Sequence, residues 1–415
     1  MSEQGSDAPA APIFNPFSPD FLRDPYPAFQ QLRATAPLHK TDMGFWVASR
    51  YDDVTLILRD KRFGKGYVER TEKMHGPDIW QQPAYASMRN WMLVKDPPDH
   101  GRLRGLVARA FAPRHLTALR PRIQQLVDAS LDKLEGRSEM EFISEFAHPL
   151  PVHVICDMLG IPEGERQQFF EGSRIAGRLI DPTPMTPEEL AEVNAGNLQQ
   201  ADYFKSLFAR RRESPGDDIT SELLQAAEDG DKLSEDELVA NVILLFGAGH
   251  ETTVNLLGNG MLALLTYPDE WEKLKADPSL VPGAVEEMLR FDSSVQMTGR
   301  TAIEDVEING ITIPQGDSVL SLLGAANRDG DEFADPEAFK VDRQGVRPTS
   351  FGGGIHHCLG APLARMEAEI AFTSLIKRLP NLRLASPNGG GDGGDGPDWS
   401  LMFTLRGLST LPVAW

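Results

Sequence analysis

Hydrophobic and polar positions follow a helical period over most of the chain. Apolar residues recur every three or four positions, with few helix breakers, over 117–134, 188–212 and 269–275. The longest pattern starts at Ser234, which has the capping-box spacing with Glu237, and continues to Leu265. A helix of roughly 30 residues is about 45 Å long. We therefore expect this helix to cross the whole domain and to be buried.

The period shortens to two residues near 45–48 and again from 306 to 323. In the second stretch, VEINGITI alternates on both sides of Asn309-Gly310, which is the strongest short signal for a β-hairpin. No internal repeat or long central linker interrupts the chain. The pattern predicts a mainly α fold with small β-sheets, in one large domain over residues 13–415. Residues 1–12 are small, polar and proline-bearing, and we expect a disordered tail there.

Composition narrows the possible functions of the 415-residue chain. Hydrophobic residues make up 41%, enough for a substantial core, and the formal net charge is −20. So acidic a chain argues against nucleic-acid binding, which requires basic patches. We find no signal-peptide pattern and no run of about 18 apolar residues, and therefore predict no membrane span. The only cysteines, Cys156 and Cys358, cannot form a disulfide framework, which favours a reducing cytoplasm.

Residues 388–398 are rich in glycine and aspartate. A single unit of a calcium-binding Gly-Asp repeat is one interpretation, but a flexible surface loop is the simpler one.

The most specific motif is FGGGIHHCLG, residues 351–360. Glycines on both sides of Cys358 let the backbone pass close to a flat ligand and leave backbone N–H groups to point at the sulfur. A helix is predicted from Ala361 to about Leu379, and its positive N-terminal end would favour a thiolate. For an isolated cysteine, a structural role in a glycine-rich turn would suffice. Zinc is another alternative, through His356, His357 and Cys358, but no second ligand pair exists. Cys156, in VICDMLGIP, is expected in the core.

The complete pattern F-G-x-G-x-H-x-C-x-G resembles the haem-binding signature of the cytochrome P450 superfamily, with every fixed position matched. The resemblance extends from about Asp24 to the C-terminus. It implies a soluble haem-thiolate protein with the P450 fold, in which haem b (iron protoporphyrin IX) lies between the long central helix and the helix after the Cys loop. Cys358 would be the axial iron ligand, with Phe351 and Gly360 also contacting the haem.

The central helix carries AGHETT at residues 248–253. Glu251 is the only carboxylate between Glu237 and Asp269. The alternative interpretation is a kinked helix with one solvated acid, but a single acid on a buried apolar helix is usually functional. Thr252 can hydrogen-bond a backbone carbonyl and bend the helix. The segment is similar to the family's oxygen-binding segment, which implies that Ala248 lies at the haem and that Glu251 and Thr252 deliver protons.

His250, on the same turn, is a competing proton source. Its alternative interpretation is a histidine that faces solvent or belongs to an ion pair.

Four residues are candidates for the haem propionates. His100 and Arg104 are four residues apart on a helix expected to start after Pro97-Pro98, so they project from one face and could clamp an anionic ligand. Arg300 and His356 match the other two propionate positions of the family. Taken alone, each of these residues could instead be a solvated cation on the surface.

Glu287 and Arg290 are three residues apart on a predicted helix and can pair. Their order before the Cys loop resembles the family's ExxR core, a structural element. We expect Arg343 to join them, although the family often has an arginine where Ala338 stands.

The resemblance implies a monooxygenase that splits O2 and inserts one oxygen atom into an apolar organic substrate, by hydroxylation or epoxidation. Thiolate donation favours O–O cleavage. Electrons would come from NAD(P)H through an external ferredoxin and its reductase. A peroxide-driven haem-thiolate enzyme and a haem-based gas sensor are the alternatives. We expect a cytoplasmic monomer.

The segment from His100 to Val127 contains six arginines and no acid, which is unusual in so acidic a chain. We predict that an acidic ferredoxin docks there, near Arg109 and Arg114, with steering by opposite charge. A solvated amphipathic helix is the alternative.

The substrate itself is not encoded in any motif. Specificity is expected in segments 64–94, 175–186, 244–248, 295–297 and 402–403. The candidate pocket residues, each of which could equally be a core residue, are Trp91, Leu93, Leu244, Ala248, Val295, Met297 and Phe403.

Overall fold

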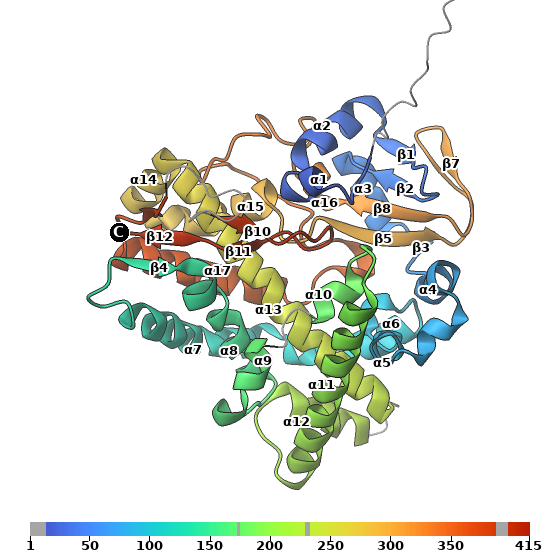
Figure 1. The fold of residues 1–415 in the computed structure, drawn as a ribbon, viewed down its shortest axis with the longest axis horizontal. Coiled ribbons are helices and arrows are strands. Elements are labelled where there is room, and N and C mark those ends of the chain that lie inside the picture. Colours follow the sequence, from blue (N-terminus) through green and yellow to red (C-terminus); the bar gives the residue numbers. More distant parts are fainter. Residues whose placement is uncertain (1–13, 172–174, 229–232, 387–396) are drawn as a thin grey trace, which may run out of the picture.

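A computed structural model describes residues 14–171, 175–228, 233–386 and 397–415. The predicted tail over 1–12 and most of the Gly/Asp-rich segment lie outside these residues. Helices make up most of what is described, with short strands at two sides of the molecule (Figure 1). The fold class is therefore as predicted.

The α-helices are α1 (Pro19–Arg23), α2 (Tyr26–Thr35), α3 (Tyr51–Arg59), α4 (Tyr67–His75), α5 (Pro83–Met88), α6 (Asp99–Ala110), α7 (Pro113–Asp132), α8 (Pro149–Met158), α9 (Gln167–Glu171), α10 (Ile175–Ile180), α11 (Pro187–Glu213), α12 (Ile219–Glu228), α13 (Glu235–Thr266), α14 (Pro268–Ala276), α15 (Val281–Phe291), α16 (Leu323–Ala326) and α17 (Ala361–Arg378). Shorter turns of helix are η1 (Pro77–Gln81), η2 (Met92–Val94), η3 (Ile143–Ala147, a π-helix), η4 (Glu163–Glu165), η5 (Pro278–Leu280) and η6 (Gly354–His356).

The strands are β1 (Leu38–Lys40), β2 (Trp46–Ala48), β3 (Phe63–Gly64), β4 (Glu139–Glu141), β5 (Met297–Ala302), β6 (Val306–Ile308), β7 (Ile311–Ile313), β8 (Ser318–Leu322), β9 (Arg383–Leu384), β10 (Asp398–Trp399), β11 (Leu408–Thr410) and β12 (Pro412–Ala414). The largest sheet has the order β1-β2-β8-β5-β3. Its β2 and β8 are parallel, and its other pairs are antiparallel.

Helix α13 is the long buried helix that the sequence predicted. Ser234 accepts a hydrogen bond from the Glu237 N–H and the Glu237 side chain accepts one from the Ser234 N–H, so the predicted capping box is complete. Acidic residues in the first turn complement the helix dipole. The helix crosses the middle of the molecule, where α8, α11, α15 and α17 pack against it (Figure 1). It can therefore present side chains to an interior site.

The other predicted elements are also present. Segments 117–134, 188–212 and 269–275 correspond to α7, α11 and α14. Helix α7 starts earlier than predicted because Pro113 fits the first turn of a helix. The predicted hairpin is β6–β7, in which Asn309 and Gly310 have φ of 51° and 77°.

Buried side chains form three clusters. The largest surrounds α13 and includes its neighbours α8, α15 and α17. The second lies between the five-stranded sheet and α3. The third joins the N-terminal helices to the sheet through Phe14, Phe21, Phe29 and Phe403. In the described part of the chain, no helix is long and apolar enough to cross a membrane.

Candidate active site

The Cys loop is a tight structure that only glycines permit. Gly352 and Gly354 have φ of 67° and 65°, in the left-handed region. A Cβ atom on Gly354 would collide with the Leu58 carbonyl oxygen of α3. The Cys358 N–H donates to the Phe351 carbonyl (2.9 Å), which closes the loop. Helix α17 starts three residues after Cys358 and ends at Arg378, as predicted.

The two cysteines lie in different surroundings. Cys156 is buried, and desolvation raises its thiol pKa to about 12, as expected for a core residue. Cys358 has solvent-accessible surface, although it lies deep among protein atoms, and this surrounding raises its pKa. The backbone N–H groups of Gly360 and Ala361, and the nearby Arg104 guanidinium, oppose that effect. A bound metal ion would supply a further cation that favours a thiolate at this position.

The structure brings the four predicted propionate residues together beside the Cys loop. The imidazole rings of His100 and His356 are 4.1 Å apart between centroids, and Arg104 Nη2 donates to the His357 carbonyl at 2.6 Å. Arg300 is 3% exposed, and burial lowers its pKa to about 10. Within the described chain, Nε2 of His100 and Nε2 of His356 are buried without a hydrogen-bond partner. Such a cationic cluster with unused donors fits the carboxylates of a haem.

Sequence reasoning missed three residues of this cluster, Lys65, Arg70 and Asp96. Lys65 is 7% exposed, and burial lowers its pKa well below the ordinary value. The Asp96 carboxylate accepts the N–H groups of Lys65 (2.7 Å) and Gly66 (3.1 Å). A lysine between two glycines, directly after an apolar strand, was the only local signal for this position.

Residues of the predicted oxygen-binding segment line the accessible part of α13. Ala248 is exposed although the helix around it is almost entirely buried, and Thr252, one turn later, is partly exposed. Thr252 Oγ1 donates to the Ala248 carbonyl at 3.0 Å, as the sequence suggested. Glu251 is half-buried and lies against α10, where a Cβ on Gly177 would be 2.5 Å from its Oε2. The segment therefore combines open space, a hydroxyl and a carboxylate.

His250 does not face solvent and has no ion pair in the described chain, so both parts of its alternative interpretation were wrong. It is 1% exposed and stacks on Phe246 at 5.4 Å, with the ring of His148 edge-on at 5.7 Å. Burial lowers the pKa of His250 to about 3, so the ring is neutral at physiological pH. A neutral ring on the far side of the helix is a poor proton source.

Glu287 and Arg290 form the predicted pair at the base of the Cys loop. Arg343 Nε donates to both Glu287 oxygens (3.1 and 3.0 Å), which confirms it as the third member. Ala338, where the family often has an arginine, contributes its carbonyl as an acceptor for Arg290 and Arg343. The same helix, α15, holds the loop through Ser350, whose hydroxyl donates to the Leu289 carbonyl at 2.7 Å.

The candidate pocket residues fall into two groups. Asn241 of α13 forms two hydrogen bonds with the segment 90–93. Its side chain accepts one from the Met92 N–H (2.8 Å) and donates one to the Asn90 carbonyl (2.9 Å). Sequence reasoning missed this residue. The candidates on or beside α13 are Trp91, Leu93, Leu244 and Ala248, of which Leu93 and Ala248 are not fully buried. The remaining candidates are Val295, Met297 and Phe403.

Met297 and Phe403 pack instead in the third core cluster, with Phe14 and Phe21. Val295 forms a bridge with Leu405 and packs against the second cluster. Core packing therefore accounts for these three residues.

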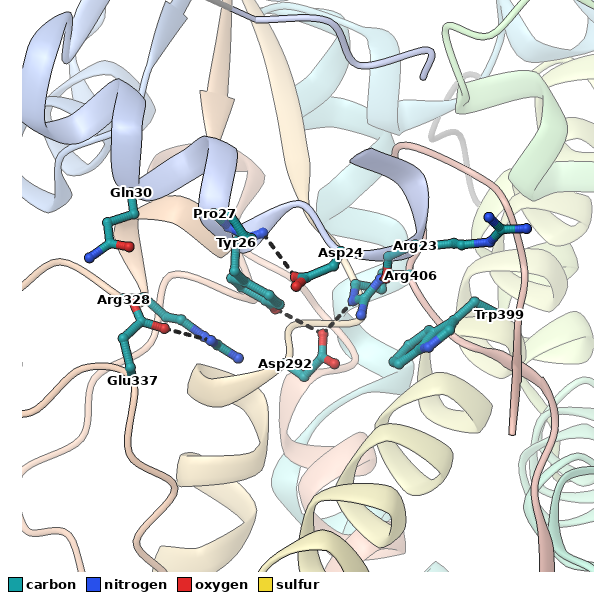
Figure 2. A pocket seen from close by; sticks show the side chains of 10 residues that line it. All are labelled: Arg23, Asp24, Tyr26, Pro27, Gln30, Asp292, Arg328, Glu337, Trp399 and Arg406. Atoms are coloured by element: carbon teal, nitrogen blue, oxygen red, sulfur yellow. Dashed lines mark hydrogen bonds and ion pairs between the residues drawn. The ribbon is translucent and has the colours of Figure 1, made fainter. Parts of the chain in front are cut away.

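A separate pocket of about 460 Å³ lies between the N-terminal helices and the end of α15 (Figure 2). Arg406 Nε and the Tyr26 hydroxyl both donate to Asp292 Oδ1 at 2.8 Å, and Arg328 Nη1 donates to Glu337 at 2.7 Å. None of the residues that line this pocket is a predicted site residue. The Tyr26 hydroxyl, and the Arg23 carbonyl that accepts a hydrogen bond from Arg406 Nη1, connect the N-terminal helices to the rest of the fold.

The arginine-rich segment is less basic than its sequence suggests. Three of its arginines form ion pairs with acids of other elements: Arg102 with Glu237, Arg120 with Glu369, and Arg122 with Asp157. Arg109 and Arg114 are exposed at the end of α6 and the start of α7, and Arg114 Nε donates to His115 at 3.0 Å. Phe111, between them, lies 4.0 Å from the position of a Cβ on Gly360, so this surface adjoins the Cys loop.

Comparisons with known proteins agree with this geometry. A sequence model described as "Cytochrome P450" matches residues 47–382. Cytochrome P450 107B1 of Saccharopolyspora erythraea is 44% identical over 372 residues, 89% of this chain and 88% of the relative. The biotin biosynthesis cytochrome P450 of Bacillus subtilis is 40% identical over 403 residues, 96% of this chain and 98% of the relative.

Among solved structures, P450BioI in complex with hexadec-9Z-enoic acid ligated acyl carrier protein superposes with a TM-score of 0.88. The two sequences are 39% identical, and the match covers 96% of this chain and all of P450BioI.

Proposed function

Because this chain belongs to the cytochrome P450 family, we propose that it is a monooxygenase that inserts one atom of O2 into an apolar organic substrate, by hydroxylation or epoxidation. The observation that carries the proposal is the pairing of Cys358 with a buried cationic cluster that has unused donors. The proposed cofactor is haem b, held by Cys358 at the iron and by His100, Arg104, Arg300 and His356 at the propionates. Bound haem with a thiolate ligand activates O2 when it receives two electrons.

The proposed work of α13 is to deliver protons in a mostly apolar interior. Thr252 holds its hydroxyl at the accessible face of the helix, where it would orient a water. Glu251 lies against α10 and is half-buried, so a rotation of its side chain would carry a proton between solvent and that water. A peroxide-driven enzyme or a sensor would not need this acid and hydroxyl side by side.

The proposed electron donor is a ferredoxin, reduced from NAD(P)H by a separate reductase. Arg109 and Arg114 give its docking surface two exposed cations, and Ile355 of the Cys loop adds an apolar side chain that is 53% exposed. Opposite charge would steer an acidic partner to the side of the molecule where the thiolate lies. We expect the enzyme to act as a cytoplasmic monomer.

The proposed substrate is apolar because Leu93, Leu244 and Ala248 border the accessible face of α13. The relative P450BioI was solved with a fatty acyl group on its carrier protein. Long-chain fatty acids and their esters are therefore the first ligands to test by displacement of the haem-bound water.

A carbon monoxide spectrum tests the proposal. The reduced protein under carbon monoxide is expected to show the far red-shifted Soret band of thiolate-ligated haem, and Cys358→His is expected to lose it. Cys156→Ser is the matched control, because that cysteine is buried away from the loop, and it should keep the band. An imidazole-type spectrum from the wild type would reject the assignment of Cys358.

A further inference from the structure

Lys65 is a buried lysine whose ammonium group lacks an acceptor. It lies between Gly64 of β3 and Gly66, the residue that precedes α4, and is 7% exposed. In the ranges that the structure describes, no group accepts a hydrogen bond from Lys65 Nζ. An ammonium group in such a position is costly unless an anion compensates it. Asp96 is the carboxylate whose charge acts on Lys65, and it accepts hydrogen bonds from two backbone N–H groups, so an anionic ligand would supply the acceptor that Nζ lacks.

Strand pairing shows where that ammonium group lies. In the antiparallel pair β3–β5, Phe63 is opposite Ala302 and Gly64 is opposite Thr301. The same register places Lys65 opposite Arg300, and the Thr301 hydroxyl donates to the Lys65 carbonyl at 3.2 Å. The charge of Lys65 also acts on the rings of His100 and His356. Lys65 thus belongs to the same cluster as the four propionate residues.

Arg70 adds a second cation to this side of the cluster. Its guanidinium lies against the β5 backbone, where a Cβ on Gly299 would be 2.9 Å from Arg70 Nη1. The guanidinium carbon is 5.9 Å from the centroid of the Tyr67 ring. Its charge acts on both Lys65 and Arg300. A Cβ at position 299 would force the guanidinium to shift, so the glycine lets it lie against β5.

Cations outnumber carboxylates in this cluster. The charges of Lys65, Arg300 and Arg104 act on the ring of His356, and Asp96 is the carboxylate that acts on Lys65 and Arg300. A ferric haem with a bound thiolate would carry the negative charge of its two propionates, because the iron and the porphyrin together offset the thiolate. The propionates would therefore supply negative charge that the buried cluster lacks.

We propose that Lys65 is a fifth propionate-binding residue of this protein, supported by the charge of Arg70. The inference rests on the proposed function, because it requires that haem binds beside Cys358. Lys65 would donate to a propionate oxygen from the β3 side of the site. Asp96 positions Lys65 by holding its backbone N–H and that of Gly66.

Haem transfer from the ferric holoprotein to excess apomyoglobin tests the inference. Lys65→Met keeps the length of the side chain without its charge, and we expect haem loss to become about 10- to 100-fold faster, because a charge-assisted hydrogen bond is lost. Lys65→Arg keeps the charge and is expected to restore most of the retention. Arg70→Gln should have a smaller effect in the same direction. Lys61→Met, an exposed lysine four residues earlier, is the matched control with an unchanged rate.

A second readout reports the propionates directly. The propionate bending bands in the resonance Raman spectrum of the holoprotein should shift in Lys65→Met and not in Lys61→Met, which a merely structural lysine would not cause. If Lys65→Met yields no folded holoprotein, the comparison is made between Arg70→Gln and Lys61→Met.

The inference is overturned if Lys65→Met loses haem at the wild-type rate, or if Lys65→Arg is as fast as Lys65→Met. It is also overturned if haem loss is unchanged while affinity falls for a fatty acid but not for its methyl ester. In that case the cations bind a carboxylate of the substrate. Failure of the proposed function is distinguishable, because the wild type would then lack the thiolate-type carbon monoxide spectrum.

Discussion

Glu287 and Arg290 form a fully buried ion pair, with Arg290 Nε donating to Glu287 Oε2 at 2.7 Å and Arg290 Nη2 to Oε1 at 2.8 Å. The remaining donors of Arg290 reach three carbonyls, those of Asn327, Pro336 and Ala338. The pair therefore connects α15 to the segments before the Cys loop, and each partner satisfies the charge of the other.

Removing one member of this pair should be severely destabilising. Glu287→Gln leaves the Arg290 guanidinium buried with too little negative charge, and we expect a loss of about 3–5 kcal/mol in the free energy of unfolding. Urea denaturation of the holoprotein measures it. Glu272→Gln makes the same chemical change in an exposed pair with Lys275, and should cost about 1 kcal/mol or less. Equal effects of the two variants would contradict a structural role for the buried pair.

Thr252→Ala should uncouple electron transfer from product formation. The variant lacks the hydroxyl that orients the proton donor, so NAD(P)H and O2 are still consumed but most electrons appear as hydrogen peroxide. We expect the ratio of product to NAD(P)H to fall roughly tenfold. Thr253→Ala is the matched control, because Thr253 is buried and donates to the Gly249 carbonyl. A wild-type ratio in Thr252→Ala would mean that Thr252 only bends the helix.

Glu251→Gln should lower the rate of the whole cycle rather than the ratio of product to NAD(P)H. Because the amide cannot carry a proton, the whole cycle is expected to slow, with a larger solvent isotope effect on turnover. Steady-state rates in H2O and D2O measure this effect. An unchanged rate and isotope effect would show that protons arrive by another route.

Charge reversal near the Cys loop should weaken binding of the redox partner and slow reduction. Arg109→Glu or Arg114→Glu is expected to slow reduction by an acidic ferredoxin about tenfold at low salt, and the wild-type rate should fall steeply as salt increases. Stopped-flow reduction under carbon monoxide measures the rate. Lys205→Glu, an exposed reversal on α11, is the control. A rate that is indifferent to salt and to both reversals would move the docking site elsewhere.

His250 should make stability depend on pH. Its pKa is about 3 in the folded protein and 6.5 when unperturbed, so the unfolded chain takes up a proton below pH 6.5 that the folded protein does not. Stability should therefore decline as pH falls from about 6.5, by roughly 1–1.5 kcal/mol at pH 5.5 from this residue. Melting temperatures between pH 5 and 7.5 should decline less steeply for His250→Gln than for the wild type. His39→Gln, on β1, should keep the wild-type slope.

Much of the site could be predicted because its parts are local in sequence. The Cys loop is one contiguous segment, and the Glu287–Arg290 and His100–Arg104 pairs have helical spacings that place two side chains on one face. The Ser234 capping box and the Asn309-Gly310 turn were predicted for the same reason. In each case the backbone geometry within a few residues decides which atoms meet, and the amino-acid types alone specify that geometry.

Tertiary structure alone decided which distant segments meet. Lys65 joins the cationic cluster because β3 pairs with β5 in one register, and Arg343 reaches Glu287 across 56 residues of sequence.

Packing against other elements decided the remaining cases. It buried His250, gave three arginines of the basic segment acidic partners, and placed Met297 and Phe403 in the core. Residue types specify which groups need a partner, but the chain's path in space determines which partner each group finds. For that reason the sequence determined the family, the Cys loop and the local pairs of this protein, and the fold determined the surroundings in which they act.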